Sequence, residues 1–319
     1  MHTVITGGAG LIGSHLARKL AARGDKVTVI DNLSTGFRAN LVETEFNPNV
    51  TLRIADVTDR SAFDDLGDVD SIVHLACPAA PAMYMSMPIE TLRAGSAGSM
   101  NALTCAAATG ARIILASSSD VYGDTAEHPQ VESSRGAIDP IGPRSAYEVA
   151  KMFTEAAAVN FHRAQNVRAG VIRPFNVYGP GMWVGDSRVV PAFCSAALAG
   201  ETLHLHGGTQ TRSLLYVDDA VTAICSMLEH DTFGPVNVGS EEEVSILDLA
   251  NKIIELAGSG SVEVTEGRAQ DAPSRCPDMC RADVVLNWQA RVSLDEGLAR
   301  TLDWMRAHRA GPAAFEVAA

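Results

Sequence analysis

Short apolar runs alternate with longer helical patterns along the first half of the chain. The runs are rich in β-branched residues and apolar enough to be buried on both faces, as the strands of a parallel sheet are. Helical patterns lie between them at 11–24, 59–66 and 89–110, and a long one occupies 145–165. This alternation predicts an α/β fold with a doubly wound parallel sheet. The expected strands are 2–6, 26–31, 50–56, 71–77, 111–118 and 167–175.

The pattern loosens after residue 176 into loops with a few shorter elements. Apolar segments lie at 191–200 and 235–240, and a helix starts at Ser245, with Asp248 three residues on as in a capping box. We expect residues 1–175 to form the sheet domain and residues 176–306 a smaller C-terminal substrate-binding lobe over its carboxyl edge. Segments of this lobe return to the sheet, and 307–319 is expected to be a disordered tail.

Composition narrows the classes of partner. A formal net charge of −13 argues against a surface for nucleic acid or for an anionic membrane. No apolar run approaches a membrane span, and "MHTVITGG" starts directly with a strand, so we expect a cytoplasmic protein. The six cysteines follow no pairing pattern, and Cys276 and Cys280 lack a second Cys/His pair, so no metal site is expected.

The segment "TGGAGLIG" carries the first chemical signal. Gly7, Gly10 and Gly13 lie between a strand and a helix, where glycines let a pyrophosphate approach the helix N-terminus. Asp31 ends the next strand, where its carboxylate can bind the adenosine ribose and would repel a 2′-phosphate. The pattern predicts a Rossmann-type domain that binds NAD rather than NADP. A purely structural turn is the alternative.

Tyr147 and Lys151 carry the second signal, because residues four apart share one helix face. A lysine beside a phenol favours the phenolate, which can take a proton from an alcohol as hydride leaves for nicotinamide. The hydroxyls of Ser118 and Ser119, at the end of a strand, would bind the same substrate hydroxyl. The alternative is a chance pair on a surface helix.

Together these motifs resemble the extended short-chain dehydrogenase/reductase superfamily, and within it the UDP-glucuronate decarboxylase family. That resemblance implies bound NAD, oxidation of the sugar at C4, loss of the carboxylate from the 4-keto acid and return of hydride to give UDP-xylose. A UDP-sugar 4-epimerase and a catalytically silent NAD-binding sensor are the alternatives. The blocks that carry the resemblance span nearly the whole chain: "HLACPAAP", "VYGDTAEHPQ", "PIGPRSAYEVAK", "RPFNVYGPGM", "SRVV", "QTRSLLYVDD" and "RCPD".

The resemblance also implies roles for individual residues. Tyr147, Lys151, Ser118, Ser119, Asp120 and Arg275 would be catalytic, and Tyr84, Asn176, Arg188, His206, Arg212 and Arg275 would bind the UDP-sugar. The alternative for each arginine is a surface position without a role in binding. His204 and His206 could serve in packing or base stacking rather than in catalysis, and His74 could be a core histidine. The implied NAD contacts are Gly7, Gly10, Leu11, Ile12, Gly13, Asp31, Asn32, Thr35, Gly36, Asp56, Val57, Leu75, Ala76, Cys77, Ala116, Tyr147, Lys151, Val177 and Arg188.

Two positions depart from the family pattern. Asp120 stands where decarboxylases have glutamate. We expect its carboxylate to order the sugar ring or a water near C5 and C6. The alternative is that the carboxylate accepts backbone amides in a tight turn. Gly95 stands where the family has an asparagine, so we expect a looser or kinked helix there. A looser site would release some UDP-4-keto-pentose.

The two alanine-rich helical segments, 89–109 and 145–165, suggest an assembly. Small residues such as Ala106, Ala107, Ala156 and Ala157 let helices approach closely. The superfamily pairs these helices with their mates across a two-fold axis, so we expect a homodimer.

Overall fold

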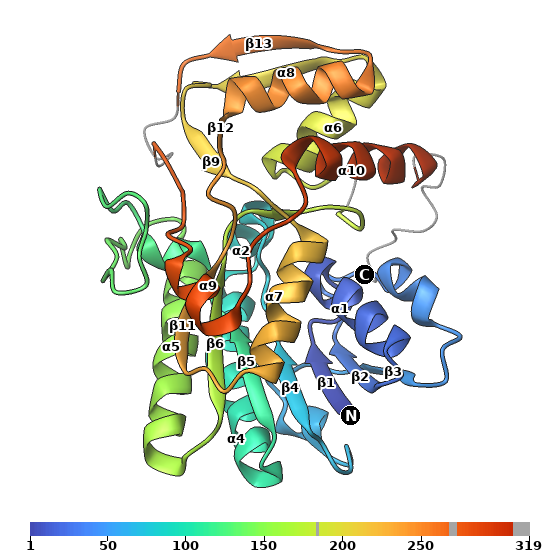
Figure 1. Ribbon diagram of the computed structural model, residues 1–319, viewed down its shortest axis with the longest axis vertical. Coiled ribbons are helices and arrows are strands. Elements are labelled where there is room, and N and C mark those ends of the chain that lie inside the picture. The colour runs from blue at the N-terminus through green and yellow to red at the C-terminus, as the bar shows by residue number, and fades with distance from the viewer. Residues whose placement is uncertain (183–184, 268–272, 309–319) are drawn as a thin grey trace.

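The computed structural model describes residues 1–182, 185–267 and 273–308 (Figure 1). Within them, seven strands form one parallel sheet in the order β11-β6-β5-β4-β1-β2-β3. The predicted α/β fold is confirmed, and each expected strand of the first half is present within two to three residues of its expected bounds. The strands are β1 (His2–Thr6), β2 (Lys26–Asp31), β3 (Val50–Ile54), β4 (Ser71–His74), β5 (Arg112–Ala116), β6 (Ala169–Pro174) and β11 (Gly234–Val238).

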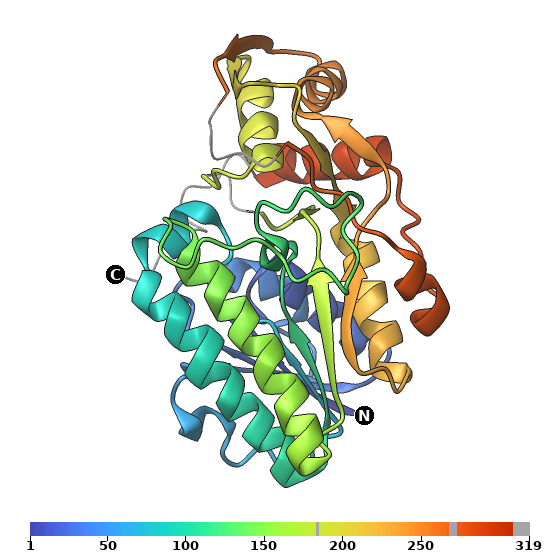
Figure 2. The same ribbon diagram turned by 90° about the vertical axis from the view of Figure 1, so that its left-hand side faces the viewer.

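Helices cover both faces of this sheet. On one face α1 (Leu11–Ala22), α7 (Val217–Glu229) and α9 (Cys280–Leu286) bury leucine, isoleucine and valine side chains against the strands. On the other face lie α4 (Ser99–Thr109) and α5 (Ser145–Gln165), side by side in Figure 2. The shorter helical segments of this half are η1 (Arg38–Thr44), η2 (Arg60–Phe63), α2 (Pro81–Ser86), α3 (Pro88–Arg93) and η4 (Ser119–Tyr122).

A second layer lies above the carboxyl edge of the sheet, at the top of Figure 1. It has its own apolar core, to which α6, α8 and α10 contribute. Ser245 caps α8 as predicted, because its Oγ accepts the backbone N–H of Asp248 at 3.0 Å. The elements are α6 (Val189–Ala199), β8 (Thr202–His206), β13 (Ser261–Thr265), α8 (Ile246–Ala257), α10 (Leu294–His308) and the short strands β7 (Val177–Tyr178), β9 (Thr211–Ser213), β10 (Leu215–Tyr216) and β12 (Glu243–Ser245).

The chain crosses between the two layers more than once. After β7 and α6 it returns to the sheet with α7 and β11, and β11 pairs with β6. The division at residue 175 stays a prediction. The expected tail lies outside the described residues except for Ala307 and His308, which end α10.

The expected helix over 89–110 is interrupted by a π-helical segment, η3 (Ala94–Gly98), between α3 and α4. A Cβ on Gly95 would lie 2.5 Å from the Cβ of Ala150 on α5, so the backbones approach too closely there for a side chain. The predicted irregularity at Gly95 is confirmed, but the predicted looseness is wrong, because the segment is tightly packed. Segment 59–66 forms only the single turn η2.

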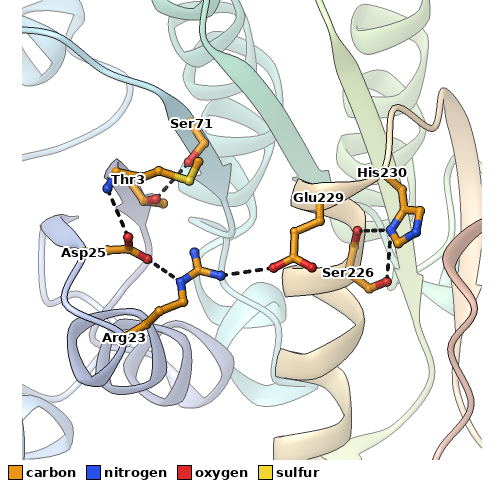
Figure 3. Close-up of polar contacts among 8 residues, drawn as sticks. Thr3, Arg23, Asp25, Ser71, Ser226, Glu229 and His230 are labelled. Carbon is orange, nitrogen blue, oxygen red and sulfur yellow. Dashed lines mark hydrogen bonds and ion pairs between the residues drawn. The ribbon is translucent and has the colours of Figure 1, made fainter.

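Ion pairs around the buried carboxylate of Asp25 link elements at the amino edge of the sheet (Figure 3). Asp25 accepts from Arg23 Nε at 2.7 Å and from the terminal amine of Met1 at 3.1 Å, and Arg23 Nη1 reaches Glu229 at 3.2 Å. These contacts join the ends of α1 and α7. In the part of the chain that the structure describes, no helix combines the length and apolar character that crossing a membrane requires.

Candidate functional site

A cleft of about 620 Å³ opens at the carboxyl edge of the sheet. It lies where the strand order reverses between β1 and β4, the place at which open α/β sheets bind ligands. A smaller hollow of about 460 Å³ continues from it into the upper layer. Asn176, Val177 and Arg188 line both, so the two form one elongated site.

The glycine turn between β1 and α1 forms a hollow, called the glycine cradle below, that has no room for side chains at Gly7 and Gly13. Gly7 has a φ of +69°, and a Cβ on it would lie 2.8 Å from Ala76 N. A Cβ on Gly13 would lie 2.4 Å from the carbonyl oxygen of Gly7, and Gly10 is the N-cap of α1. The exposed backbone and the first-turn amides of α1 fit the pyrophosphate of a dinucleotide.

Asp31 lies beside this cradle at the end of β2. Its Oδ2 accepts the backbone N–H of Ala9 at 2.9 Å and its Oδ1 that of Leu33 at 2.8 Å. Burial raises the pKa of Asp31, and the two amide hydrogen bonds oppose that rise. The carboxylate is thus oriented for ribose hydroxyls, which fits NAD. Nearby, Asn32 Nδ2 donates to Asp56 at 3.0 Å.

Tyr147 and Lys151 lie on the face of α5 that lines the cleft. Lys151 Nζ donates to the carbonyl of Ala116 at 2.8 Å and lies 5.5 Å from the centre of the Tyr147 ring. Burial, followed by the charge of Asp120, raises the pKa of Tyr147 far above its usual value, while a hydrogen bond with the Ser118 side chain opposes the rise. Burial is the largest of these influences, and the effect expected from Lys151 stays a prediction.

Asp120 lies between two arginines. Its Oδ2 is 3.1 Å from Arg144 Nη2, and its Oδ1 is 3.8 Å from Arg275 Nη1. Its backbone N–H donates to Ser118 Oγ at 3.1 Å. Among the described contacts, none joins a backbone amide to the Asp120 carboxylate, so the alternative of a carboxylate that caps a turn finds no support.

Arg144 is the site residue that sequence reasoning missed. It is the N-cap of α5, three residues before Tyr147, and its side chain lines the cleft. The signal was available in "PRSAY", since a residue three positions from a catalytic tyrosine shares its helix face.

Arg275 and Tyr84 lie behind the cleft rather than on its surface. Arg275 Nη1 donates to the carbonyl of Ser119 at 2.7 Å and is 5% exposed. The ring of Tyr84 stacks on Tyr147 with centres 4.9 Å apart and is 1% exposed. In this structure both support groups that line the cleft, which differs from the direct sugar contact that the resemblance implied.

The remaining predicted residues divide between the two parts of the site. All nineteen predicted NAD contacts line the cleft, together with Ser118, Ser119 and Asp120. His206 and Arg212 line the upper hollow, and Arg188 forms a bidentate ion pair with Asp186. The roles assigned to these residues stay predictions.

Two other histidines have structural partners. His74 is buried, with Nδ1 2.8 Å from Thr6 Oγ1 and Nε2 3.3 Å from Ser99 Oγ, as expected of a core histidine. Burial lowers the pKa of His74 to about 3. His204 pairs with Glu263 on the neighbouring strand.

Comparisons with known proteins agree with this geometry. Residues 3–239 match the NAD dependent epimerase/dehydratase family. The chain is 41% identical to UDP-glucuronic acid decarboxylase 1 of Arabidopsis thaliana over 96% of this chain and 70% of that protein. Its structure is similar to that of UDP-glucose 4-epimerase from Thermotoga maritima with UDP-glucose, with a TM-score of 0.88, 30% identity and coverage of 97% and 100% of the two chains.

A dTDP-glucose 4,6-dehydratase from Streptomyces venezuelae with NAD bound is also similar, with a TM-score of 0.87, 29% identity and coverage of 97% and 98%. The resemblance expected from the sequence motifs is thus confirmed. The chain belongs to the NAD dependent epimerase/dehydratase family, within which it is similar to the UDP-glucuronic acid decarboxylases.

Proposed function

We propose that the protein is an NAD-dependent enzyme that decarboxylates UDP-glucuronate to UDP-xylose through a 4-keto intermediate. The observation that carries the proposal is the arrangement at the floor of the cleft. There a buried tyrosine contacts a serine and a lysine, and a carboxylate lies between two arginines. The relatives named UDP-glucuronic acid decarboxylase support the choice of substrate.

NAD, when bound in the glycine cradle, supplies a reversible hydride acceptor. Tyr147 removes the proton from the C4 hydroxyl, and Ser118 holds that hydroxyl in line. Because Tyr147 and Lys151 both line the cleft, the phenol can approach the sugar while the ammonium, fixed to Ala116, places positive charge near it.

Oxidation at C4 makes the C6 carboxylate that of a β-keto acid. Such an acid loses CO2 readily, because the electrons of the breaking bond flow into the ketone and give an enolate. Tyr147 and Ser118 stabilise the oxygen that becomes negative. Protonation at C5 and return of hydride to C4 then give UDP-xylose, and Asp120 lies where it can order the ring for these steps.

The upper hollow suits the UDP moiety. Asn176 has a φ of +39°, and its Nδ2 donates to the carbonyl of Ser213 at 2.9 Å, which fixes the start of the hollow. Arg188 and Arg212 place positive charge at this hollow of an overall acidic chain. His206 stands on β8 at the far end, where a base can stack.

The proposed assembly is a homodimer through α4 and α5. Met100, Met152 and Phe153 are each about 40% exposed on these helices, and Leu92 of the neighbouring α3 is 36% exposed. Of the predicted small residues, Ala107 and Ala156 are exposed, whereas Ala106 and Ala157 are buried. Light scattering at micromolar concentration should give twice 33.6 kDa, and a monomer would overturn this part. A cytoplasmic location is also proposed, from the sequence alone.

Incubation with UDP-glucuronate, followed by proton NMR, tests the activity. UDP-xylose with evolved CO2 is the expected result, with some UDP-4-keto-pentose and residual NADH if the final reduction is slow. Conversion to UDP-galacturonate would instead identify a 4-epimerase. Binding of NAD without turnover would identify a sensor, and either result would overturn the proposal.

A further inference from the structure

Decarboxylation requires that the enzyme distinguish a sugar with a C6 carboxylate from one without it. The C4 hydroxyl must lie at Tyr147, and C6 is two carbon–carbon bonds from C4, each about 1.5 Å. The carboxylate therefore lies within a few ångströms of the Tyr147 hydroxyl. A cation of the protein within reach of that point would recognise it.

The described cations that line the cleft are Arg93, Arg144, Lys151 and Arg188. Lys151 is bonded to Ala116, and Arg188 is paired with Asp186 in the loop before α6. Arg93 acts on Asp56, close to Asn32 at the end of the cleft where Asp31 lies. This leaves Arg144 as the cation next to both Tyr147 and Asp120.

Arg144 is held in place but incompletely bonded. Its Nη2 pairs with Asp120, and its Nε lies 3.7 Å from Glu148 Oε1, one helical turn along α5. The Nε is buried on the side of Glu148 and is closed to a ligand. A guanidinium presents five donors in a fixed fork that matches a carboxylate, so a ligand in the cleft would meet the Nη groups, of which Nη2 pairs with Asp120.

We infer that Arg144 binds the C6 carboxylate of the sugar and is the residue that selects UDP-glucuronate over neutral UDP-sugars. The inference rests on the proposed function and deepens it. Asp120 holds the guanidinium in the free enzyme, and the substrate carboxylate competes with Asp120 for it.

The charges around Arg144 favour release of Asp120 when the substrate carboxylate binds. Two carboxylates, Asp120 and Glu148, already lie beside Arg144 before substrate binds. A third carboxylate would compete with Asp120 for the guanidinium, and Asp120 would then be free to face C5. When the C5–C6 bond breaks, its electron pair moves into the ketone and the carboxylate leaves as neutral CO2. Arg144 then returns to Asp120.

Calorimetric titration in a Tyr147→Phe background, where turnover is blocked, separates recognition from catalysis. UDP-glucuronate, UDP-glucose and UDP-xylose are the three ligands. Arg144→Gln should weaken UDP-glucuronate binding about ten- to hundredfold, as expected for loss of a charged hydrogen bond. Binding of the other two should change by less than about twofold, because they lack the carboxylate.

Arg163→Gln, at the exposed C-terminal end of the same helix, is the matched control and should change none of the three affinities. If Arg144→Gln folds poorly, the double variant Arg144→Gln/Asp120→Asn removes both partners and should show the same selective loss. Equal losses for all ligands, or none, would overturn the inference. Failure of the otherwise unchanged protein to bind or convert UDP-glucuronate would instead overturn the proposed function.

Discussion

The two edges of one parallel sheet use ion pairs for different purposes. At the amino edge, Arg23 and Glu229 are 41% and 62% exposed, and their direct ion pair joins the ends of α1 and α7 (Figure 3). At the carboxyl edge, Asp120 lines the cleft and Arg275 lies behind it, with side chains 19% and 7% exposed. Exposed pairs contribute between zero and about 1 kcal/mol, whereas removal of one partner of a buried pair leaves an uncompensated charge.

The two sets of ion pairs differ in what lies beside them rather than in how deeply they are buried. At the amino edge, burial raises the pKa of Asp25, but hydrogen bonds from Arg23 and the terminal amine lower it overall. At the carboxyl edge, Asp120 raises the pKa of Tyr147, which lines the cleft. Substitutions at the two edges should therefore separate activity from stability.

The largest expected effect is on turnover. Tyr147→Phe should lower kcat by two or more orders of magnitude, because the general base is removed while the ring and its stacking on Tyr84 are kept. NAD content and the unfolding midpoint should stay near those of the unaltered protein. Arg23→Ala is the amino-edge control. Near-normal turnover of Tyr147→Phe would contradict the hydride-transfer chemistry.

The next effect is on the pH dependence of stability. Burial lowers the pKa of His74 from 6.5 to about 3, so between these values the unfolded chain binds more protons than the folded one. The contribution of His74 is fully present above pH 6.5 and is lost as the pH falls, by about 2 kcal/mol between pH 7 and pH 5. Between pH 7 and pH 5, the unfolding free energy of His74→Gln, measured in urea, should therefore fall by about 2 kcal/mol less than that of the unaltered protein. An equal fall in both proteins would show that folding does not shift the pKa of His74.

A loss of stability of comparable size is expected where η3 meets α5. Gly95→Ala places a Cβ 2.5 Å from that of Ala150, next to Lys151, and should cost about 1–3 kcal/mol of unfolding free energy through overpacking. Gly110→Ala is not a clean control, because Gly110 has a φ of +71°. Gly267 is the better control, because its backbone is in the ordinary region and no atom of the described residues lies closer than 3.6 Å to an added Cβ. A Gly95→Ala protein as stable as the Gly95 form would show that the helices can separate at no cost.

The smallest effect is expected at the amino edge. Arg23→Ala should change the unfolding free energy by less than about 1 kcal/mol, and the difference should shrink in high salt. Asp25 keeps the terminal amine of Met1 as a partner, which limits the loss. Chemical denaturation at two ionic strengths measures it. A loss of several kcal/mol would contradict the expectation that the ion pairs at the amino edge contribute little to stability.

Local patterns sufficed for the elements and for the cofactor half of the site. Apolar runs marked the strands, and the spacing of Gly7, Gly10 and Gly13 placed the cradle, because the turn between β1 and α1 fixes that geometry within a few residues. The shape of the upper hollow was harder to predict from the sequence, since it depends on contacts between segments that are far apart along the chain.

The contacts within the charged cluster join residues that are far apart in the sequence. Arg144 meets Asp120 across 24 residues, and Arg275 reaches the Ser119 carbonyl across 156. The sequence shows that Arg144 precedes Tyr147 by three residues, but it does not show which side chain Arg144 meets. The pKa of Tyr147 likewise depends on how deeply α5 buries the phenol, which the spacing of Tyr147 and Lys151 does not reveal.

The proposed reaction removes the C6 carboxylate of a UDP-sugar at the carboxyl edge of the sheet. Carbon NMR in a sealed tube, with UDP-glucuronate labelled with carbon-13 at C6, follows that carbon itself. The carboxylate signal should disappear and an equal amount of labelled CO2 and bicarbonate should appear, with no such change in Tyr147→Phe. If the label stays on the sugar while the substrate is consumed, the proposed reaction is contradicted.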